Sequence, residues 1–546
     1  MRLANRALCH PGGIDVRFHG WVPGGQKSDR KTIQRSGNQP ELIFGLIGAL
    51  GAGLSSVADS IRRELREVGY RVGNHPIKVS SLMHKLPGEP FSTLYQNERR
   101  AGVEVYMDAG SILRERLRPD ALAMFSVNAI RAAREAEFGE PQDGPANGTA
   151  FILDSLKHHE EVETLRRLYG AAFIAVGVYT PYRVRLEAVE KRLRDTAGHG
   201  NPDDFRHDAE RLMEKDRDEQ ERSFGQHVSD AFALADVVVS TAGNESSSIE
   251  RFVRLLFGDW TKTPTRDEVG MTHALVSAYR SSSMARQVGA AICREDGTLV
   301  ATGTNDVPKS GGGIFDADDV AAKRPDVRDF SAFGYDTSDD HRRELLQDIL
   351  VRLIQTDVVT SISEDGAQIA AQAMLGRGGV MRRAKFMATI DYVRAMHAEA
   401  AALSSAASYG DAVRGCTLYV TTFPCHDCTK DIIASGIHRV VYVEPYTKSL
   451  AQVFYDKQIN VDGSNSYDQA VKFEPFVGVA PRRYRELFAM AGNRKDDLGR
   501  YRPWDKDEAI PRLPETLAGA SARSAGEKAE LTAFDELLEQ NSLRPL

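Results

Sequence analysis

The chain has 546 residues, of which 42% are hydrophobic and 27% charged, with a formal net charge of -7 and a pI near 6.1. This length exceeds what one hydrophobic core serves, so we expect two domains with tails. The acidic balance disfavours stable nucleic-acid binding through a basic surface. Five cysteines do not form a disulfide framework, the N-terminus lacks a signal-peptide core, and no apolar run reaches bilayer length. We therefore expect a cytoplasmic protein without membrane contact.

The chain begins with residues 1–40, which are rich in Gly, Arg, Ser and Pro and show no periodicity. We interpret them as a flexible arm. A buried strand is predicted over residues 41–47, followed by a glycine-rich turn and a helix over 57–68. Strand, glycine-rich turn and helix are the context of a phosphate-binding loop, because backbone N–H groups at a helix N-terminus bind phosphate.

The glycine-rich turn departs from the P-loop pattern G-x-x-x-x-G-K-[ST] at one position. Gly48, Gly53 and Ser55 match the spacing, but Leu54 stands where the lysine belongs. That lysine neutralises charge on the β- and γ-phosphates, so phosphoryl transfer is disfavoured while nucleotide binding stays open. The alternative is a glycine-rich turn without a ligand. The residues expected to bind a nucleotide are Gly48, Gly51, Gly53, Ser55, Ser56, Asp154, Arg183 and Arg185.

Further apolar strands alternate with helices up to about residue 260. The strands are predicted at 150–155, 171–178 and 236–240, with a closing helix at 246–257. Continuous apolar strands alternating with helices indicate a doubly wound parallel sheet. Asp154 ends its strand where a carboxylate reaches Mg²⁺ beside a P-loop. Residues 182–222 resemble the lid of nucleoside-monophosphate kinases, or else form a solvated helical face. We predict a P-loop, kinase-like domain over 41–260.

A linker is predicted at 259–268, and a second α/β domain over 268–490. It begins with a helix at 271–279 and two strands joined by an Asp-Gly turn. Residues 309–390 form an insertion with a helix at 341–355. The last strands are predicted at 438–443 and 471–479, and residues 493–546 are expected to be a charged tail with a helix near 532–540.

Two motifs in the second domain carry a defined chemistry. His397-Ala-Glu399 is followed by Pro424-Cys425-His-Asp-Cys428, the His-x-Glu and Pro-Cys-x-x-Cys pattern of zinc nucleobase deaminases. Catalytic zinc takes three protein ligands and leaves a fourth position for water. His397, Cys425 and Cys428 are the predicted ligands, and Glu399 is left to move protons. The alternative, a closed structural site, requires a fourth ligand, for which His426 and Cys416 are the candidates.

Both motifs are predicted at helix N-termini. Pro424 suits the first residue of a helix that ends at Gly436, which places Cys425 and Cys428 in its first turn. His397 and Glu399 fall in the first turn of an Ala-rich helix over 396–407. The positive end of a helix dipole favours thiolates. Zinc would acidify a water molecule, and Glu399 would carry protons to the ring nitrogen and the departing ammonia.

These motifs resemble those of the dCMP deaminases. Residues 424–442, His397-Ala-Glu399, Gln287-Val-Gly-Ala290 and Gly303-Thr-Asn305 carry the resemblance, which covers about 268–480. It implies a cytidine-deaminase-like α/β/α domain, with a mixed five-stranded sheet flanked by helices, and a homo-oligomer. A P-loop domain in front of such a deaminase resembles the bacterial anti-phage dCTP/dCMP deaminases. That resemblance implies conversion of dCTP or dCMP to dUTP or dUMP, with depletion of cytosine deoxynucleotides during infection.

The resemblance also implies roles for substrate-binding residues. Asn305 would hydrogen-bond the sugar, although Thr304 replaces the tyrosine of the family motif; its alternative is a turn-former. Arg286 is a candidate phosphate contact or an isolated surface residue, and Tyr446 a candidate for stacking on the base or for packing. The implied cofactors are Zn²⁺ and, at the P-loop, a regulatory nucleotide with Mg²⁺.

Two other functions stay open. The first is deamination of a base in RNA or single-stranded DNA, which needs a cationic groove with aromatic side chains. A basic stretch from Arg377 to Lys385 favours it, while the acidic chain disfavours it. The second is a P-loop kinase or switch with a zinc domain as sensor, which Leu54 disfavours.

Overall fold

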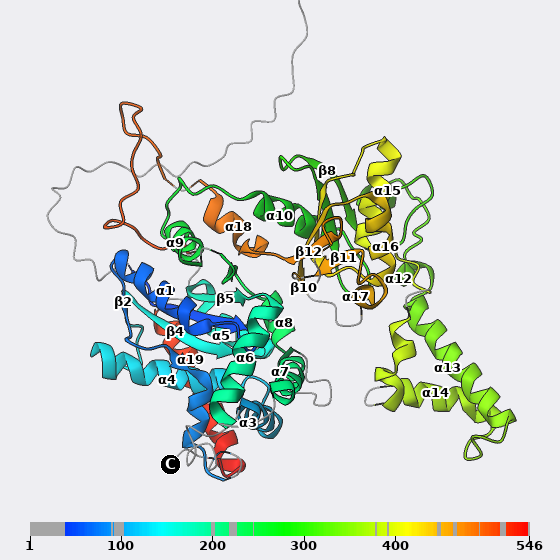
Figure 1. Ribbon diagram of the computed structural model, residues 1–546, viewed down its shortest axis with the longest axis horizontal. Helices are drawn as coiled ribbons and strands as arrows, with labels where there is room; N and C mark the ends of the chain where they lie inside the picture. Colours follow the sequence, from blue (N-terminus) through cyan, green and yellow to red (C-terminus); the bar gives the residue numbers. More distant parts are fainter. Residues whose placement is uncertain are drawn as a thin grey trace, which may run out of the picture.

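The computed structural model describes residues 39–543, except for 89–90, 92–102, 198–201, 218–226, 244, 377–378, 390–391, 445–448, 462, 464–466, 491 and 514–519. Two sheets, each rich in parallel pairs, form two α/β domains (Figure 1). The expected arm at residues 1–40 lies outside the described residues apart from its last two. None of the described helices combines the length and the apolarity that crossing a bilayer demands.

The first sheet has the order β13-β6-β5-β1-β4-β2, with β3 also paired to β4. All pairs are parallel except that of β13 with β6. The predicted parallel sheet is therefore confirmed. The central strand β1 is buried along its whole length, as expected for a strand covered on both faces. The strands are β1 (Leu42–Gly48), β2 (Arg71–Val72), β3 (Ile77–Lys78), β4 (Thr149–Leu156), β5 (Phe173–Tyr179), β6 (Val237–Ser240) and β13 (Gly478–Val479).

Helices cover both faces of this sheet because β1 alternates its apolar side chains. Ile43 and Ile47 face a core with α4 and α5, whereas Leu42 and Phe44 face a core with α1 and α9. The helices of the domain are α1 (Leu54–Glu67), η2 (Val79–Lys85), α3 (Val103–Arg116), α4 (Ala121–Phe138), α5 (His159–Tyr169), η3 (Gly170–Ala172), α6 (Tyr182–Ala197), α7 (Pro202–Arg217), α8 (Val228–Ala233) and α9 (Glu245–Leu256).

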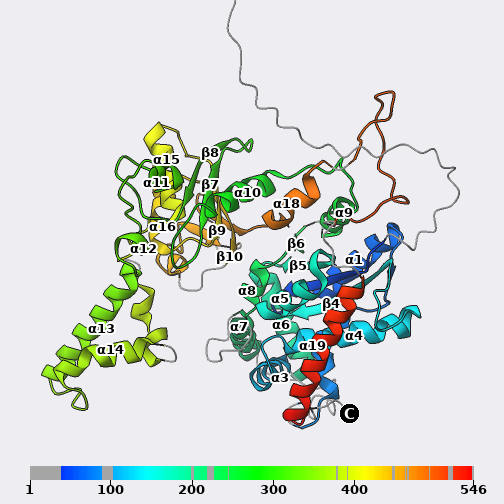
Figure 2. The ribbon, with the colours of Figure 1, turned by 180° about the vertical axis from the view of Figure 1, so that it is seen from behind.

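The C-terminal helix α19 (Ala520–Gln540) belongs to this first domain. It packs on α4 and α5 (Figure 2), and Phe534 and Leu538 are part of the core there. Glu527, fully buried, binds Arg134 at 2.7 Å, and Arg134 also binds the buried Glu41. The segment expected to be a charged tail therefore contains a helix that completes the N-terminal core, because its apolar face and one acidic residue match α4.

The second sheet has the order β11-β12-β10-β9-β7-β8 and is mixed, with six strands where the resemblance implied five. β7 pairs antiparallel with β8 through the predicted Asp-Gly turn, and β9, β10, β12 and β11 run parallel. The strands are β7 (Gly289–Cys293), β8 (Leu299–Thr304), β9 (Thr417–Thr422), β10 (Arg439–Glu444), β11 (Ile459–Val461) and β12 (Val471–Pro475).

Two glycines let helices approach this sheet closely, one on each face. A Cβ at Gly289 would lie 2.0 Å from the carbonyl oxygen of Ala274 in α10 (Arg266–Ala278), and a Cβ at Gly303 would lie 2.1 Å from that of Ala398 in α15 (Ala398–Tyr409). Only glycine fits at either position. The start of α15 is thus fixed against β8. The other helices are α16 (His426–Ser435), α17 (Ala451–Phe454) and α18 (Pro481–Phe488).

The two domains share a strand and a core. The single strand predicted at 471–479 is wrong: β12 ends at Pro475 in the second sheet, and β13 then pairs with β6 of the first sheet. Val238 packs with Met271 and Phe476 between the domains. The buried Glu268, inside the predicted linker, binds Arg251 and accepts the Val479 N–H at 2.8 Å. The predicted linker therefore ends in a buried residue that joins the two domains, while most of its other residues are partly or fully exposed.

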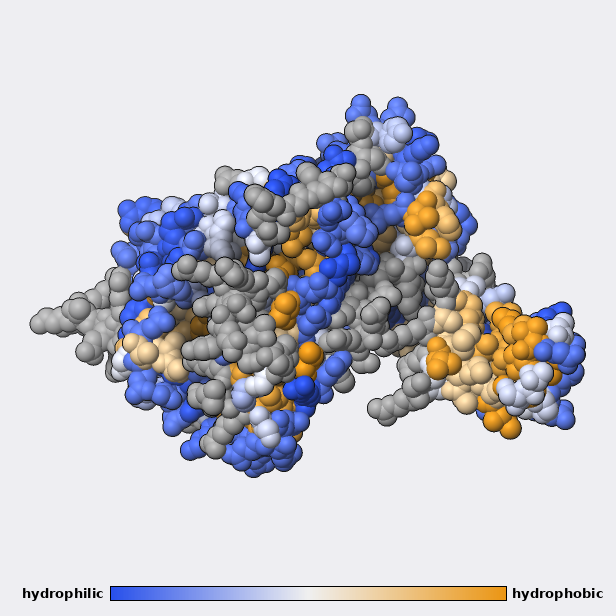
Figure 3. Space-filling model, turned by 60° about the horizontal axis from the view of Figure 1, so that its bottom comes forward, coloured by the Kyte–Doolittle hydropathy of each residue, from blue (hydrophilic) through white to orange (hydrophobic). Residues whose placement is uncertain are grey.

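The insertion projects from the second domain as a helical arm (Figures 1 and 2). Its helices are α11 (Ala317–Ala321), α12 (Asp329–Ala332), α13 (Thr337–Gln355), η4 (Glu364–Gly366), α14 (Ala367–Leu375), η5 (Val380–Arg383) and η6 (Lys385–Ala388). The predicted helix at 341–355 lies within α13. The arm has a small core around Leu346, Leu350, Ala367 and Ala371, and apolar residues gather on its surface (Figure 3).

Candidate metal centre and substrate cavity

Three side chains of the second domain meet at one point. The Sγ of Cys425 lies 3.2 Å and the Sγ of Cys428 3.4 Å from Nδ1 of His397. All three donor atoms lie within 4.8 Å of one another. In a tetrahedral zinc site, Zn–S and Zn–N bonds of about 2.3 and 2.0 Å place S and N about 3.5 Å apart. The three donors therefore fit zinc in both chemistry and spacing.

Two helix N-termini create this arrangement. His397 is the N-cap of α15, and Cys425 is the N-cap of α16, where its sulfur accepts the Cys428 N–H at 3.3 Å. α16 thus begins two residues after Pro424, which we expected to be its first residue, and it ends before Gly436 as predicted. The helix start is shifted because the cysteine sulfur supplies the capping acceptor that the free N–H groups require.

The protonation of the three donors suits metal binding. Hydrogen bonding from Cys428 lowers the pKa of Cys425 to about 4, and hydrogen bonding to Cys425 raises the pKa of His397 to about 9. The hydrogen bond between Cys428 and Cys425, together with burial, raises the pKa of Cys428. These pKa shifts favour the thiolate form of Cys425 and the protonated forms of its two neighbours. A metal ion would displace those protons, so binding should weaken as the pH falls.

Within the described residues, this site has three ligands and no fourth. Over the part of the chain that the structure describes, no further His, Cys, Asp or Glu joins the group. The two candidates from sequence lie elsewhere: the ring of His426 packs against Phe454, and Cys416 is buried with its sulfur 3.9 Å from the Ala412 oxygen. The geometry is that of a three-ligand site with an open position, which is the catalytic type.

Glu399 stands in the first turn of α15, two residues after His397. Its side chain is buried, and it lines the same cavity as His397 and Cys425. Burial raises the pKa of Glu399 to about 7. A carboxyl group with a pKa near the working pH can both accept and donate a proton, as acid–base catalysis requires.

The cavity beside these residues has a volume of about 380 Å³, which lies within the usual range for small-molecule sites. It is lined by the turn before β7, the segment after β8, the start of α13 and the residues before α15. Asp306 at its wall is buried and accepts the Ser282 N–H and hydroxyl, both at 2.8 Å. Asp306 thus fixes the turn that carries Arg286.

The predicted substrate-binding residues have different outcomes. Asn305 lines the cavity, but its amide oxygen accepts the Val288 N–H at 2.6 Å and its nitrogen donates to the Arg286 carbonyl at 2.8 Å. Its side chain therefore holds the turn before β7 in place. Arg286 also lines the cavity, half exposed and 3.5 Å from Glu444. Tyr446 lies outside the described residues.

Comparisons with known proteins agree with this centre. Residues 264–444 match the cytidine and deoxycytidylate deaminase zinc-binding region. The chain contains a deaminase zinc-binding domain. The deoxycytidylate deaminases of Enterobacteria phages T2 and T4 are each 48% identical to this chain over 54 residues, which is 10% of this chain and 29% and 28% of their own lengths. The deaminase domain and its zinc-binding character, predicted from the motifs, are thereby confirmed.

Two further similarities extend beyond the motifs. A UPF0200 protein of Halobacterium salinarum is 24% identical over 246 residues, 45% of this chain and 94% of that protein, in the N-terminal part. The dCMP deaminase of cyanophage S-TIM5, solved with dCMP and dUMP, is 18% identical with a TM-score of 0.22 and covers 39% of this chain and 98% of that one. Neither identifies the N-terminal domain as a P-loop domain.

The glycine-rich turn of the first domain is occupied by a carboxylate of its own chain. Asp216 at the end of α7, 1% exposed, accepts the Leu50 N–H at 2.6 Å and binds Lys157 at 2.9 Å. Lys157 also donates to the Gly48 carbonyl at 2.8 Å. The turn lies at the carboxyl end of β1, between the neighbours β4 and β5, where open α/β sheets place their ligands.

The other residues predicted around this turn fall into two groups. Gly51 and Gly53 have the positive φ values, 83° and 73°, that the turn needs. Asp154 lies on β4 opposite Leu46 of β1, close to the turn that follows β1. The side chains of Ser56 and Arg185 point elsewhere, to Glu245 at 3.0 Å and to the Thr180 carbonyl at 3.0 Å. Ser55 and Arg183 are exposed. Lys157 and Asp216 were not predicted, because no local pattern links them to the turn.

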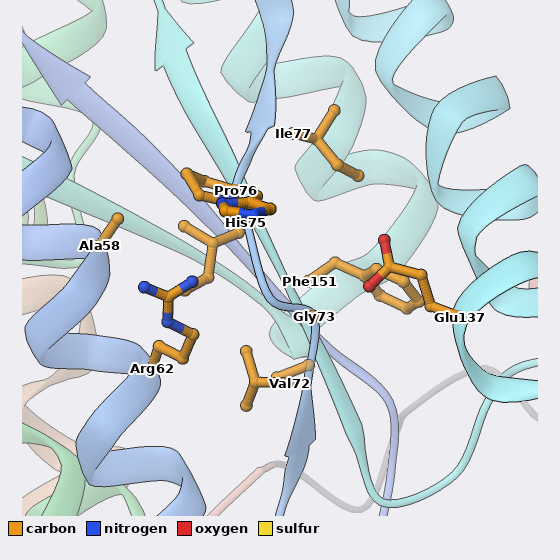
Figure 4. A pocket seen from close by; sticks show the side chains of 11 residues that line it. Ala58, Arg62, Val72, Gly73, His75, Pro76, Ile77, Glu137 and Phe151 are labelled. Atoms are coloured by element: carbon orange, nitrogen blue, oxygen red, sulfur yellow. The ribbon is translucent and has the colours of Figure 1, made fainter.

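A small cavity also lies between α1 and α4. Arg62 and Glu137 approach it from these two helices, on either side of residues 72–77 (Figure 4). Its volume of about 10 Å³ is that of roughly one water molecule. It is too small for a substrate.

Proposed function

We propose that the chain is a zinc-dependent hydrolase that deaminates deoxycytidine nucleotides, dCMP and/or dCTP, to the uracil nucleotides and ammonia. The observation that supports this most is the buried carboxyl of Glu399 on the same cavity as the open His397–Cys425–Cys428 group. The zinc-binding deaminase match, and the phage deoxycytidylate deaminases that are 48% identical to this chain over 54 residues, point to the same substrate class.

The chain's own residues account for each proton of the reaction. Zinc bound by His397, Cys425 and Cys428 would supply the Lewis acidity that makes water a nucleophile at neutral pH. Glu399 would take a proton from the attacking water and give it to the ring nitrogen next to the reacting carbon. Glu399 would then carry the proton of the new ring hydroxyl to the amine, which leaves as ammonia while the hydroxyl becomes the carbonyl of uracil. Water and cytosine thereby become uracil and ammonia.

A substrate panel tests this function. Zinc-loaded protein should release ammonia from deoxycytidine nucleotides, while an oligonucleotide containing cytosine should give none. Glu399→Ala is the matched control, since the exchange leaves all three metal donors in place. Turnover of the oligonucleotide alone would show that the chain edits strands instead. The net charge of -7 disfavours a polyanionic strand.

Anti-phage defence in the cytoplasm is the proposed biological role, and it rests on the resemblance of the two-domain order to such deaminases. Cells producing the protein should lose dCTP and dCMP on infection and yield fewer phage than cells producing Glu399→Ala. Equal pools and equal yields would contradict this role. We also propose a homo-oligomer, for which sedimentation of the full chain is the measurement.

A second candidate function is nucleotide binding at the glycine-rich turn, as a regulator of the deaminase. What supports it is that the Leu50 N–H and Lys157 together hold an oxyanion, the Asp216 carboxylate. Lys157 would supply the positive charge that Leu54 cannot. Asp216→Ala should therefore bind pyrophosphate or ATP more tightly than the unsubstituted protein. Asp208→Ala, an exposed change on the same helix, is the control. Equal affinities for pyrophosphate or ATP in all three proteins would show that the turn has only a structural role.

A kinase is the weaker version of this second function. Transfer of phosphate from ATP to dCMP, lost in Asp154→Ala, would favour it.

A further inference from the structure

The end of β10 holds the segment that leads to Cys425. The carbonyl of Glu444, the last residue of β10, accepts the Phe423 N–H at 2.7 Å, and its carboxylate accepts the Thr422 hydroxyl at 3.3 Å. The ring of Phe423 also packs edge-on against Tyr442 of β10, with the ring centres 4.9 Å apart. Phe423 and Thr422 line the cavity together with Cys425. The position of β10 therefore sets the position of the chain that enters the metal centre.

The opposite face of β10 packs on the first domain. Successive side chains of a strand point to opposite faces, so Val441 and Val443 face away from Tyr442. They belong to the core between the domains, which also contains Phe232 of α8 and Tyr179 at the end of β5. α8 lies next to β10 in both views of the molecule (Figures 1 and 2). A shift of α8 or of the end of β5 would therefore displace β10.

The start of α8 is connected to the glycine-rich turn through Lys157. The N–H of His227, the N-cap of α8, donates to the Lys157 carbonyl at 3.1 Å. The ammonium group of Lys157 binds the Gly48 carbonyl at 2.8 Å and the Asp216 carboxylate at 2.9 Å. One residue thus contacts the turn with its side chain and α8 with its backbone. A change in the anion bound at the turn reaches α8 through this single residue.

A second connection runs from the turn through the end of β5. The hydroxyl of Thr180 donates to the Ala52 carbonyl of the turn at 2.9 Å, and it lies 2.6 Å from the hydroxyl of Thr241. Thr180 directly follows Tyr179, which belongs to the core between the domains. Both connections therefore lead from the turn to the core on which β10 packs.

We propose that the glycine-rich turn and the metal centre are coupled through α8 and β10, so that the anion held at the turn sets the zinc affinity of the deaminase centre. In the structure this anion is the Asp216 carboxylate. Phe232 acts on the metal centre through β10 and is a positioning residue. The inference rests on metal binding by the proposed deaminase centre. It depends neither on turnover nor on nucleotide binding at the turn.

A double-mutant cycle tests the coupling. Competition with a chelator measures the zinc affinity of four full-length proteins: the unsubstituted protein, Asp216→Ala, Phe232→Ala and the double variant. Asp216→Ala removes the carboxylate from the turn and should change the zinc affinity by at least about fivefold, the lower end of the range for coupled sites. In the Phe232→Ala background the same exchange should change it by less than about twofold, as expected for uncoupled positions.

Two further variants separate positioning from a general loss of stability. Asp208→Ala, an exposed change on the same helix as Asp216, should leave the zinc affinity unchanged. Phe232→Leu keeps an apolar side chain against the core beside β10, so the response of the zinc affinity to Asp216→Ala should persist in that background.

Three results would contradict these statements in different ways. Equal zinc affinities in Asp216→Ala and Asp208→Ala would overturn the coupling, and this comparison is valid even if Phe232→Ala does not fold. A shift of the same size with and without Phe232→Ala would overturn the connection through α8. An unsubstituted protein that bound no zinc would refute the proposed metal centre itself, and the coupling with it.

Discussion

The metal centre and the glycine-rich turn both lie next to helix N-termini, but a cavity opens beside the metal centre, whereas a carboxylate of the same chain binds at the turn. Both place reactive groups at helix N-termini, at α15 and α16 in one case and at α1 in the other. At the metal centre the helices contribute Cys425 and His397 themselves as donors, and a cavity opens beside them. In the loop before α1, Asp216 of the same chain accepts the Leu50 N–H. The surroundings, more than the motif, decide which helix end is open to a ligand.

The largest effect is expected from substitution of a metal ligand, which tests whether the metal centre is the open site. Cys425→Ala or His397→Ala should lose zinc and ammonia release together, by roughly three orders of magnitude or more in turnover, because two remaining donors cannot hold a catalytic ion. Metal analysis and an ammonia assay on the same samples measure both. Retained zinc with retained turnover would show that the ion lies elsewhere. The N-terminal domain should keep its fold in both variants.

A smaller effect is expected from the contact that positions α15. In Gly303→Ala the new Cβ would lie 2.1 Å from the Ala398 oxygen, so the helix that begins at His397 must move. Zinc affinity should fall by about 10–100-fold, the scale seen when a group that orients a metal ligand is lost. Competition with a chelator measures it. Ser404→Ala, an exposed change on the same helix, should have no effect, and equal affinities in both variants would contradict this packing argument.

The smallest effect concerns a charge at the start of α10. Asp267 is partly buried, which opposes ionisation, but hydrogen bonds from Arg439 at 2.7 and 2.9 Å outweigh burial and lower the pKa of Asp267. A lowered folded pKa stabilises the protein above the usual Asp pKa of about 4, and this stabilisation is lost as the pH falls through the folded value.

Asp267→Asn should therefore reduce the free energy of unfolding by about 1–2 kcal/mol at pH 7. The two denaturation curves should converge as the pH falls below about 4. Urea titrations at several pH values measure this difference. A difference that stays constant over that range would mean that the pair contributes through packing alone.

Local sequence predicted much of the second domain and less of the joint between domains. The residues around His397 and Cys425 indicate two helix starts. The metal-binding group of His397, Cys425 and Cys428 could therefore be predicted from spacing alone. The division of 471–479 into two strands could not be predicted, because both halves are apolar and extended. They differ only in their partners: β13 pairs with β6 of the first sheet, whereas β12 stays in the second sheet. The role of α19 was equally hard to predict, since Glu527 and Arg134, which form an ion pair, are 393 residues apart in the sequence.

The candidate sites differ in the same way. Glu399 is defined by its distance of two residues from His397, whereas Lys157 and Asp216 reach the glycine-rich turn from distant elements. Arg328 and Arg342 join the cavity only because the insertion folds back against the turn before β7. Chemistry fixed by sequence spacing was predictable, and chemistry fixed by tertiary contacts was not.

The central claim is that Glu399 moves protons beside a metal that it does not bind. The most direct test measures zinc content and ammonia release from dCTP and dCMP in the same preparations of the unsubstituted protein and Glu399→Gln. The account predicts equal zinc and a loss of turnover of about 10²- to 10⁴-fold, the contribution of a general acid–base residue. Loss of zinc in Glu399→Gln, or turnover that survives the change, would contradict it.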